Sequence, residues 1–266
     1  MRTMAHKRRN TILAVSGKGG VGKTTISALI LKYLTLKRPL PNILVLDVDP
    51  DTNMPDVLGM RVDRAHTVGG IAHELREQIK KGKLKPNFNK ASYLESKTFE
   101  IMIEEEEFDM IVMSKSEGTG CYCFINSAMS GIIDTLQDGY HYVVIDTAAG
   151  LEHFSRRTMK DLDHLFIVTD PSKMGLKTAK RIITMTTELE ISVGNVHIIG
   201  NRFTPENESI LRKYFENEGE NVDVLGILPQ DPEIQRLNLM GKSLLEIPID
   251  NPLYQGIHDF MKLVNL

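Results

Sequence analysis

The sequence predicts an α/β fold with a doubly wound, mostly parallel β-sheet and helices on both of its faces. Short apolar runs alternate along the 266 residues with longer stretches whose apolar positions follow the helical period. The short runs are apolar throughout, as strands are when helices cover both faces of a parallel sheet. No internal repeat or low-complexity linker interrupts the alternation. We therefore expect a single domain over residues 1–266, with residues 1–10 as a flexible N-terminal extension.

The predicted strands are the short buried runs. The first is Thr11–Ser16, and two others, Asn42–Asp47 and Tyr142–Asp146, each end on an aspartate. The others cover residues 110–113, 165–169, 196–200 and 224–228. Between residues 80 and 107 the pattern is least regular and strongly charged. There we expect a strand at Phe99–Ile103 and a solvated acidic run at Glu104–Glu107, with a partner-binding patch as the alternative for that run.

The predicted helices are the longer periodic stretches. They cover residues 24–36, 68–81, 126–136, 174–189 and 252–264. The C-terminal helix has an apolar face but only one cation, Lys262. A helix that lies on a lipid surface carries several cations, so we expect this face to pack in the core.

Composition and charge exclude several classes of protein. With 41% apolar and 25% charged residues, the chain is neither disordered nor fibrous. Its net charge of −3 lacks the basic excess that is typical of proteins held by nucleic-acid phosphates. No apolar run is long enough to span a membrane, and the first ten residues lack the apolar core of a secretory signal. We expect a cytoplasmic protein with no nucleic-acid partner and no stable membrane anchor.

The strongest motif matches the phosphate-binding pattern G-x-x-x-x-G-K-[ST], and it lies between the first predicted strand and the first predicted helix. Its residues are Gly17, Lys18, Gly19, Gly20, Val21, Gly22, Lys23, Thr24 and Thr25. Glycines let successive backbone N–H groups point at phosphate oxygens, and the helix adds its positive dipole end. We expect Lys23 to reach the β- and γ-phosphates of ATP or ADP, and the Thr24 hydroxyl to bind Mg²⁺.

Lys18 extends the standard motif with a second lysine. The loop thereby resembles the deviant Walker A group of P-loop ATPases, which includes nitrogenase iron protein, the septum-site and chromosome-partitioning ATPases, and the CooC-type ATPase that matures carbon monoxide dehydrogenase. In that group the early lysine reaches the nucleotide of the partner subunit. The resemblance implies that Lys18 is catalytic, that it stabilises negative charge on the transferred phosphoryl group, and that ATP hydrolysis needs a homodimer.

Two further segments resemble the switch regions of that group. The segment Asp47–Asp51 closes a strand and resembles the first switch, in which Asp49 would orient the attacking water and contribute to the Mg²⁺ site. The segment Asp146–Gly150 resembles the second switch, in which Asp146 would hold Mg²⁺ directly or through water and the Gly150 amide would sense the γ-phosphate. Both follow parallel strands at their carboxyl ends, where ligands bind in such sheets.

Two loops near the C-terminus resemble the adenine-side loops of the same group. They contain Asn201 and Arg202, after the strand at 196–200, and Pro229, after the strand at 224–228. The resemblance implies that these residues contact the nucleotide. Ordinary turn residues are the alternative.

The only two cysteines of the chain, Cys121 and Cys123, are separated by one residue. Two thiolates fill half of a tetrahedral site, so two copies on a two-fold axis would complete it. Sulfur ligands suit Zn²⁺, Ni²⁺, Cu⁺ or an iron–sulfur cluster. The Cys-x-Cys pair resembles the metal site of the CooC-type ATPases, with Thr147 and Ala148 as a departure from their second switch. His153 lies downstream and would be near the metal or simply at the surface.

The function that these features favour is nucleotide-driven delivery of a metal, nickel by resemblance or zinc by ligand chemistry, to a client of the carbon monoxide dehydrogenase type. One alternative is a spatial organiser like the septum-site and partitioning ATPases. Another is a reductase component that carries an iron–sulfur cluster.

Overall fold

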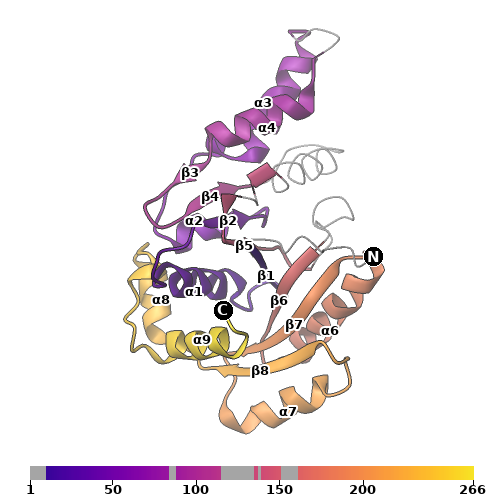
Figure 1. Ribbon diagram of the computed structural model, residues 1–266, viewed down its shortest axis with the longest axis vertical. Coiled ribbons are helices and arrows are strands. Elements are labelled where there is room, and N and C mark those ends of the chain that lie inside the picture. Colours follow the sequence, from indigo (N-terminus) through magenta and orange to yellow (C-terminus); the bar gives the residue numbers. More distant parts are fainter. Residues whose placement is uncertain (1–9, 84–87, 115–134, 137–138, 151–160) are drawn as a thin grey trace, which may run out of the picture.

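The computed structural model describes residues 10–83, 88–114, 135–136, 139–150 and 161–266. Within these residues, eight strands form one sheet in the order β3-β4-β2-β5-β1-β6-β7-β8 (Figure 1). Only β3 and β4 pair in antiparallel fashion, and the other pairings are parallel. The predicted doubly wound, mostly parallel sheet is therefore confirmed.

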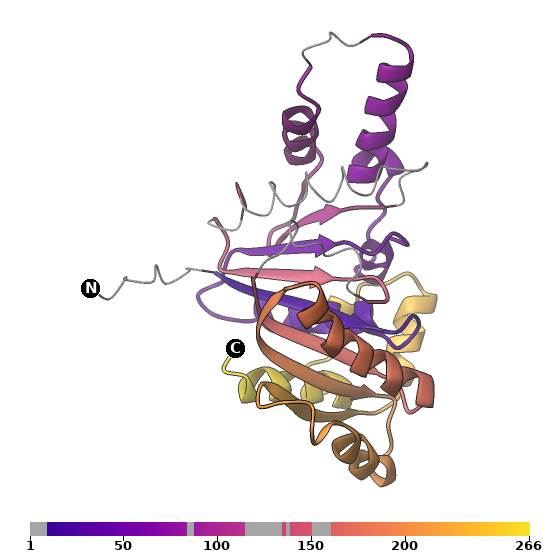
Figure 2. The ribbon, with the colours of Figure 1, turned by 90° about the vertical axis from the view of Figure 1, so that its right-hand side faces the viewer.

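The parallel strands run side by side, so that the carboxyl ends of all the described strands except β3 meet at one edge of the sheet (Figure 2). Their bounds are β1 (Thr11–Gly17), β2 (Ile43–Asp47), β3 (Ile103–Glu104), β4 (Asp109–Val112), β5 (Tyr142–Asp146), β6 (Asp161–Thr169), β7 (Ser192–Asn201) and β8 (Val222–Leu228). Central β1 is flanked by β5 and β6, and β5 in turn pairs with β2. This order places the predicted phosphate loop between the two predicted switch segments on one side and the end of β6 on the other.

Helices cover both faces of the sheet. Their bounds are α1 (Lys23–Thr35), α2 (Asn53–Val57), α3 (Val68–Lys80), α4 (Lys90–Glu100), α6 (Lys173–Glu188), α7 (Pro205–Phe215), α8 (Pro232–Leu239) and α9 (Pro252–Leu263), with short 3₁₀ turns at η1 (Arg64–His66) and η3 (Leu244–Glu246). Alternate residues of β1 point to opposite faces, so Leu13 joins a core with α1, α8 and α9, whereas Ile12 joins a core with α3, α6 and α7. Both cores are apolar, as the all-apolar strands require.

The C-terminal helix α9 packs in the core, as its sequence predicts. Its buried side chains are Leu253, Tyr254, Ile257, Phe260 and Met261. They belong to the same hydrophobic core as α1. No helix among the described residues is long and apolar enough to cross a membrane.

The strand predicted at Phe99–Ile103 is wrong. Phe99 lies in the last turn of α4. Of the predicted strand residues only Ile103 is in a strand, the short β3 (Ile103–Glu104), which runs antiparallel to β4. The Asn89 side chain caps α4 by accepting two backbone N–H groups of its first turn, and the buried face of the helix packs against α3. The alternating apolar residues at 99–103 therefore straddle the end of a helix and a short edge strand, two elements with different periods.

Figure 1 shows α3 and α4 side by side, extending away from the sheet. The acidic run Glu104–Glu107 is exposed, in line with a solvated segment. Helices α2, α4, α7 and α8 were not among the predicted helices. Most of the helix predicted at 126–136, and the extension at residues 1–9, lie outside the described residues.

Candidate nucleotide site

The loop between β1 and α1 needs glycine at two positions. Gly17 has a φ of 154°, and a Cβ there would lie 2.2 Å from the Val168 carbonyl oxygen of β6. Gly22 has a φ of 98°, in the left-handed region, and a Cβ there would lie 2.5 Å from the Asn201 side-chain nitrogen. The backbone can therefore approach β6 and the end of β7 closely, as a phosphate-binding turn requires.

Helix α1 begins at Lys23 with its N-terminus open to a ligand. Its N-cap is Gly22, and no side chain among the described residues caps it. The first N–H groups of a helix lack acceptors within the helix, and they attract anions through hydrogen bonding and the helix dipole. Lys23 is 6% exposed, so its ammonium group adds a buried positive charge to this end of the helix.

The hydroxyl of Thr24 donates a hydrogen bond of 2.7 Å to a carboxylate oxygen of Asp146. The Ser27 hydroxyl lies 2.9 Å from the other oxygen of the same carboxyl. Asp146 is fully buried, and this burial raises its pKa to about 6, although the bonds from Thr24 and Ser27 and the charge of Lys23 oppose the rise. A hydroxyl and a carboxylate are hard oxygen donors, so this pair fits Mg²⁺.

Asp47 and Asp146 end adjacent parallel strands at the same register position. Burial is the main reason that the pKa of the Asp47 carboxyl lies well above its usual range, and the negative charge of Asp146 raises it further. Asp47 accepts backbone N–H groups from Asp49 and Met54, both at 3.1 Å. It thereby holds the turn that carries Asp49, which is 9% exposed and lies at the same edge of the sheet.

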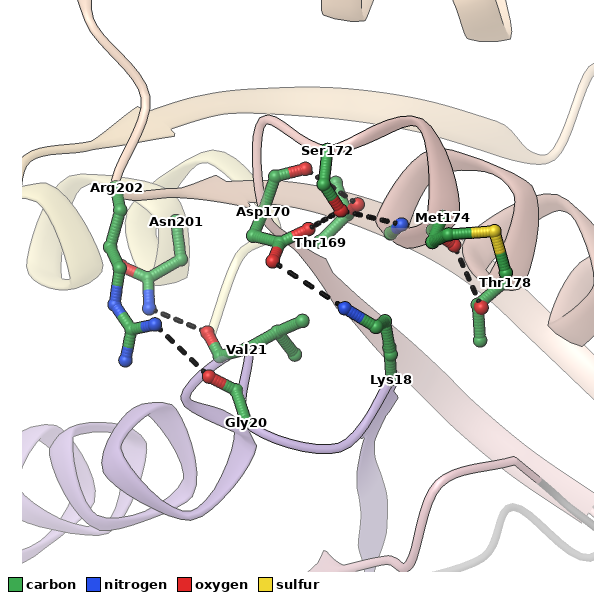
Figure 3. A network of polar contacts seen from close by, with 11 residues as sticks. Lys18, Gly20, Val21, Thr169, Asp170, Ser172, Met174, Thr178, Asn201 and Arg202 are labelled. Atoms are coloured by element: carbon green, nitrogen blue, oxygen red, sulfur yellow. Dashed lines mark hydrogen bonds and ion pairs between the residues drawn. The ribbon is translucent and has the colours of Figure 1, made fainter.

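The end of β7 and the residue after it contact the phosphate loop from the other side (Figure 3). The Asn201 side-chain N–H donates to the Val21 carbonyl at 2.7 Å, and Arg202 donates to the Gly20 carbonyl at 3.0 Å. The Asn201 side-chain oxygen is buried and has no hydrogen-bond partner in the described structure. Because a buried acceptor without a partner is costly, it is suited to accept an N–H from a bound nucleotide base.

Pro229 is exposed and follows Leu228, the last residue of β8 and the register partner of Asn201. Gly150 has a φ of 103° and lies near β1, where its carbonyl is 3.5 Å from the Ser16 hydroxyl. Thr25 lies in the first turn of α1, and Gly19 is exposed on the loop. The nucleotide contacts of these residues stay predictions.

Lys18 lies toward the end of β6, which flanks β1 on the side opposite to β5, the strand that ends at Asp146. Its ammonium nitrogen is 3.9 Å from a carboxylate oxygen of Asp170, which follows β6 (Figure 3). The side chain of Lys18 is 39% exposed. Within this chain Lys18 therefore belongs to the β6–α6 side of the site.

Three polar residues of this site received no role from the sequence. Ser27 lies three residues after Thr24, a spacing that places both on one face of α1. Asp47 stands two residues before Asp49, and Asp170 follows the strand after the second switch segment. The position of Asp47 and Asp170 at the carboxyl ends of parallel strands could have marked them as site residues, because ligands bind there in such sheets. The helical spacing from Thr24 could have marked Ser27 in the same way.

The predicted transition-metal ligands Cys121 and Cys123, like His153, lie outside the described residues. Among the residues that are described, no group of three or more His, Cys, Asp or Glu side chains is arranged to hold a metal ion. The Cys-x-Cys metal site therefore stays a prediction.

The loop, helix N-terminus and strand order define a P-loop nucleotide-binding protein. Residues 12–244 match the family model described as the CobQ/CobB/MinD/ParA nucleotide-binding domain. The chain belongs to this family of ATPases.

Individual relatives agree with this assignment. The chain is 42% identical to an ATP-binding protein of Methanocaldococcus jannaschii, over 96% of this chain and 98% of the relative. It is 26% identical to the carbon monoxide dehydrogenase accessory protein CooC of Rhodospirillum rubrum, over 88% of this chain and 90% of the relative. A ParA family ATPase of Chlorobium tepidum has the same fold, with a TM-score of 0.69 at 21% identity over 94% of this chain and 97% of that structure.

Proposed function

We propose that this protein hydrolyses Mg²⁺-ATP across a homodimer and uses the nucleotide cycle to bind and release a transition metal. The observation that carries the nucleotide part is the contact between Thr24 and Asp146 beside the open N-terminus of α1. A hydroxyl, a carboxyl and a set of N–H groups converge there on one edge of the sheet. This is the donor set that a magnesium-bound triphosphate needs.

Each residue of the proposed site has a separate role toward the nucleotide. Backbone N–H groups of residues 17–25 and the Lys23 ammonium group bind the phosphates, while Thr24 and Asp146, with Asp49 directly or through water, hold Mg²⁺. The bound Mg²⁺ neutralises phosphate charge. Asp49 orients the attacking water, and the Gly150 amide senses the γ-phosphate. Asn201, Arg202 and Pro229 border the nucleotide base.

Lys18 supports the dimer part of the proposal. Its side chain is partly exposed and pairs with Asp170, away from the Thr24–Asp146 contact. The resemblance of the loop to the deviant Walker A group supports an action of this lysine on the nucleotide of a second subunit. A cation supplied in this way stabilises the charge of the transferred phosphoryl group, as an arginine finger does.

The metal part rests on the Cys121–Cys123 spacing and on the likeness to the CooC accessory protein. Two subunits would supply four thiolates to one ion, and opening of the dimer would leave two, which releases the ion. The cargo is Ni²⁺ by family likeness or Zn²⁺ by ligand chemistry, and the client is an enzyme of the carbon monoxide dehydrogenase type.

A spatial organiser of the septum-site or partitioning type is the second candidate, because the family model includes those proteins by name. The buried apolar face of α9 argues against a C-terminal membrane helix of the kind that such an organiser would use. Co-sedimentation with anionic liposomes in the presence of ATP separates the two candidates. Strong ATP-dependent pelleting would favour the organiser. An iron–sulfur reductase would instead be brown after anaerobic purification.

The nucleotide part is tested with Lys18→Ala and, as a matched control, Lys177→Ala on the exposed surface of α6. Light scattering with ADP, ATP or Ni²⁺ measures self-association, and phosphate release measures hydrolysis. We expect Lys18→Ala to reduce hydrolysis roughly a thousandfold, the lower range for a cation supplied in trans. The control should behave as the wild type. Full hydrolysis by monomeric protein, or by Lys18→Ala, would contradict the proposal.

The metal part is tested by metal analysis of the purified dimer. We expect about one ion per wild-type dimer, as four thiolates predict, and its loss in Cys121→Ser and in Cys123→Ser. An unchanged metal content in both variants would remove the cysteines from the proposed cycle and leave the nucleotide part standing.

A further inference from the structure

Lys18 has an anionic partner within its own subunit. Its ammonium nitrogen lies 3.9 Å from one oxygen of Asp170, and the two side chains are 39% and 23% exposed (Figure 3). The two residues come from different elements: Lys18 from the phosphate loop and Asp170 from the turn between β6 and α6. The pair therefore links the position of the Lys18 side chain to the sheet of the same subunit.

The Asp170 carboxylate is held in place by the start of α6. The Ser172 hydroxyl donates to its second oxygen at 2.5 Å, and the same hydroxyl caps α6 by accepting the Gly175 N–H at 2.9 Å. A Cβ at residue 175 would lie 2.1 Å from that carboxylate oxygen, so glycine lets the carboxylate rest against the helix backbone. A negative charge at a helix N-terminus is also favoured by the helix dipole.

We propose that Asp170 is a positioning residue that retains Lys18 in the separate subunit and sets the threshold for ATP-dependent dimer formation. This inference rests on the proposed action of Lys18 in trans. The ammonium group of Lys18 lies against Asp170 of its own subunit, so extension of the side chain to the nucleotide of a second subunit would take each Lys18 away from its own Asp170. Part of the free energy of association is then consumed in breaking the pair.

The size of the effect follows from the exposure of the pair. Exposed ion pairs shift an equilibrium by about 1.4-fold to 5-fold. A symmetric dimer breaks two of them, so removing the pair should tighten self-association about 2-fold to 25-fold. Salt screens exposed charges, so this gain should shrink as ionic strength rises.

The test is Asp170→Asn, which keeps the shape of the side chain and an oxygen to accept from Ser172 but removes the charge. Sedimentation velocity with ATP gives the dimer Kd of the wild type and of the variant at low and high salt. The matched control is Glu188→Gln, which removes one exposed charge near the other end of α6. We expect a dimer Kd about 2-fold to 25-fold lower for Asp170→Asn at low salt, a smaller gain at high salt, and no change for the control.

Two further variants exclude a merely structural role. In a Lys18→Ala background, Asp170→Asn should leave the dimer Kd unchanged, because there is no pair to break. Gly175→Ala displaces the Asp170 carboxylate but keeps its charge, so it should also tighten the dimer. Gly175→Ala can also replace Asp170→Asn in this test if the Asp170→Asn variant does not fold. If Asp170→Asn lowered the dimer Kd equally in the wild-type and Lys18→Ala backgrounds, the inference would be overturned.

The inference and the proposed function fail in different ways. If the wild type forms an ATP-dependent dimer and Asp170→Asn forms it equally well or more weakly, only the role of Asp170 is overturned. If the wild type forms no ATP-dependent dimer at all, the action of Lys18 in trans is overturned, and the role of Asp170 is overturned with it.

Discussion

Replacing Asp146 by asparagine should stabilise the protein that is free of nucleotide and Mg²⁺. The Asp146 carboxyl is fully buried, and burial raises its pKa from 3.8 to about 6 against the opposing bonds from Thr24 and Ser27. The folded protein thus binds this proton more tightly than the unfolded chain does. The free energy of unfolding therefore falls as the pH rises from about 4 to about 6, and the full cost of the buried charge is present above that range.

The magnitude follows from the two pKa values. At about 1.4 kcal/mol per pH unit, a rise from 3.8 to about 6 makes the ionised carboxylate cost about 3 kcal/mol at neutral pH. Asparagine does not ionise, and the hydroxyls of Thr24 and Ser27 can turn to suit an amide. From the two pKa values, burial of the Asp146 carboxyl lowers the free energy of unfolding of the wild type by about 1 kcal/mol at about pH 4.5 and by about 3 kcal/mol at about pH 7.5. Loss of the negative charge also relieves Asp47, which adds to the gain in the same direction.

Urea unfolding at the two pH values, with EDTA present, measures this difference. We expect the advantage of Asp146→Asn over the wild type to grow by about 2 kcal/mol between about pH 4.5 and about pH 7.5. Asp250→Asn, which changes an exposed carboxyl, should show no such growth. An Asp146→Asn variant that is no more stable than the wild type at neutral pH, or whose advantage does not depend on pH, would show that burial of the carboxylate does not carry this cost.

Two other substitutions test the packing around the site and the sheet. Gly22→Ala forces a side chain into a left-handed backbone and against the Asn201 amide. It should therefore lower the free energy of unfolding by about 1–3 kcal/mol and weaken ATP binding. Gly19→Ala, which has open space around the added Cβ, is the control for stability alone. His197 is 3% exposed, and burial, with the nearby charge of His164, lowers its pKa to about 4, so the wild type should lose about 3 kcal/mol as the pH falls from about 6.5 to about 4. Acid unfolding followed by circular dichroism should show that His197→Phe lacks this loss, and an equal loss in the variant would contradict the explanation.

The phosphate loop and its flanking elements could be predicted because their signals are local. Glycines at fixed spacing, a lysine and a hydroxyl lie within nine residues, and the apolar runs on either side have different periods. The end of α4 could not be predicted in the same way. The residues from Phe99 to Ile103 alternate like a strand, but packing of α4 on α3 carries the helix through Glu100.

Contacts across the site were beyond the reach of sequence patterns. Thr24 and Asp146 are 122 positions apart, and Asn201 lies 180 positions from Val21. They meet because β1 pairs with β5 on one side and β6 on the other, and because β7 continues the sheet. Periodicity indicates that each segment is a strand, but it does not specify its neighbours in the sheet.

Sequence patterns alone were enough for the class of fold, the position of the glycine-rich turn of the phosphate-binding motif and the buried face of the C-terminal helix, because backbone preference and apolar spacing act over a few residues. Three features appear only in the folded chain: the Asp146 carboxyl is buried beside Thr24, Asp47 accepts backbone N–H groups from the turn before α2, and Lys18 pairs with Asp170. These features depend on strand order and on exclusion of water, and both arise only when distant segments pack together.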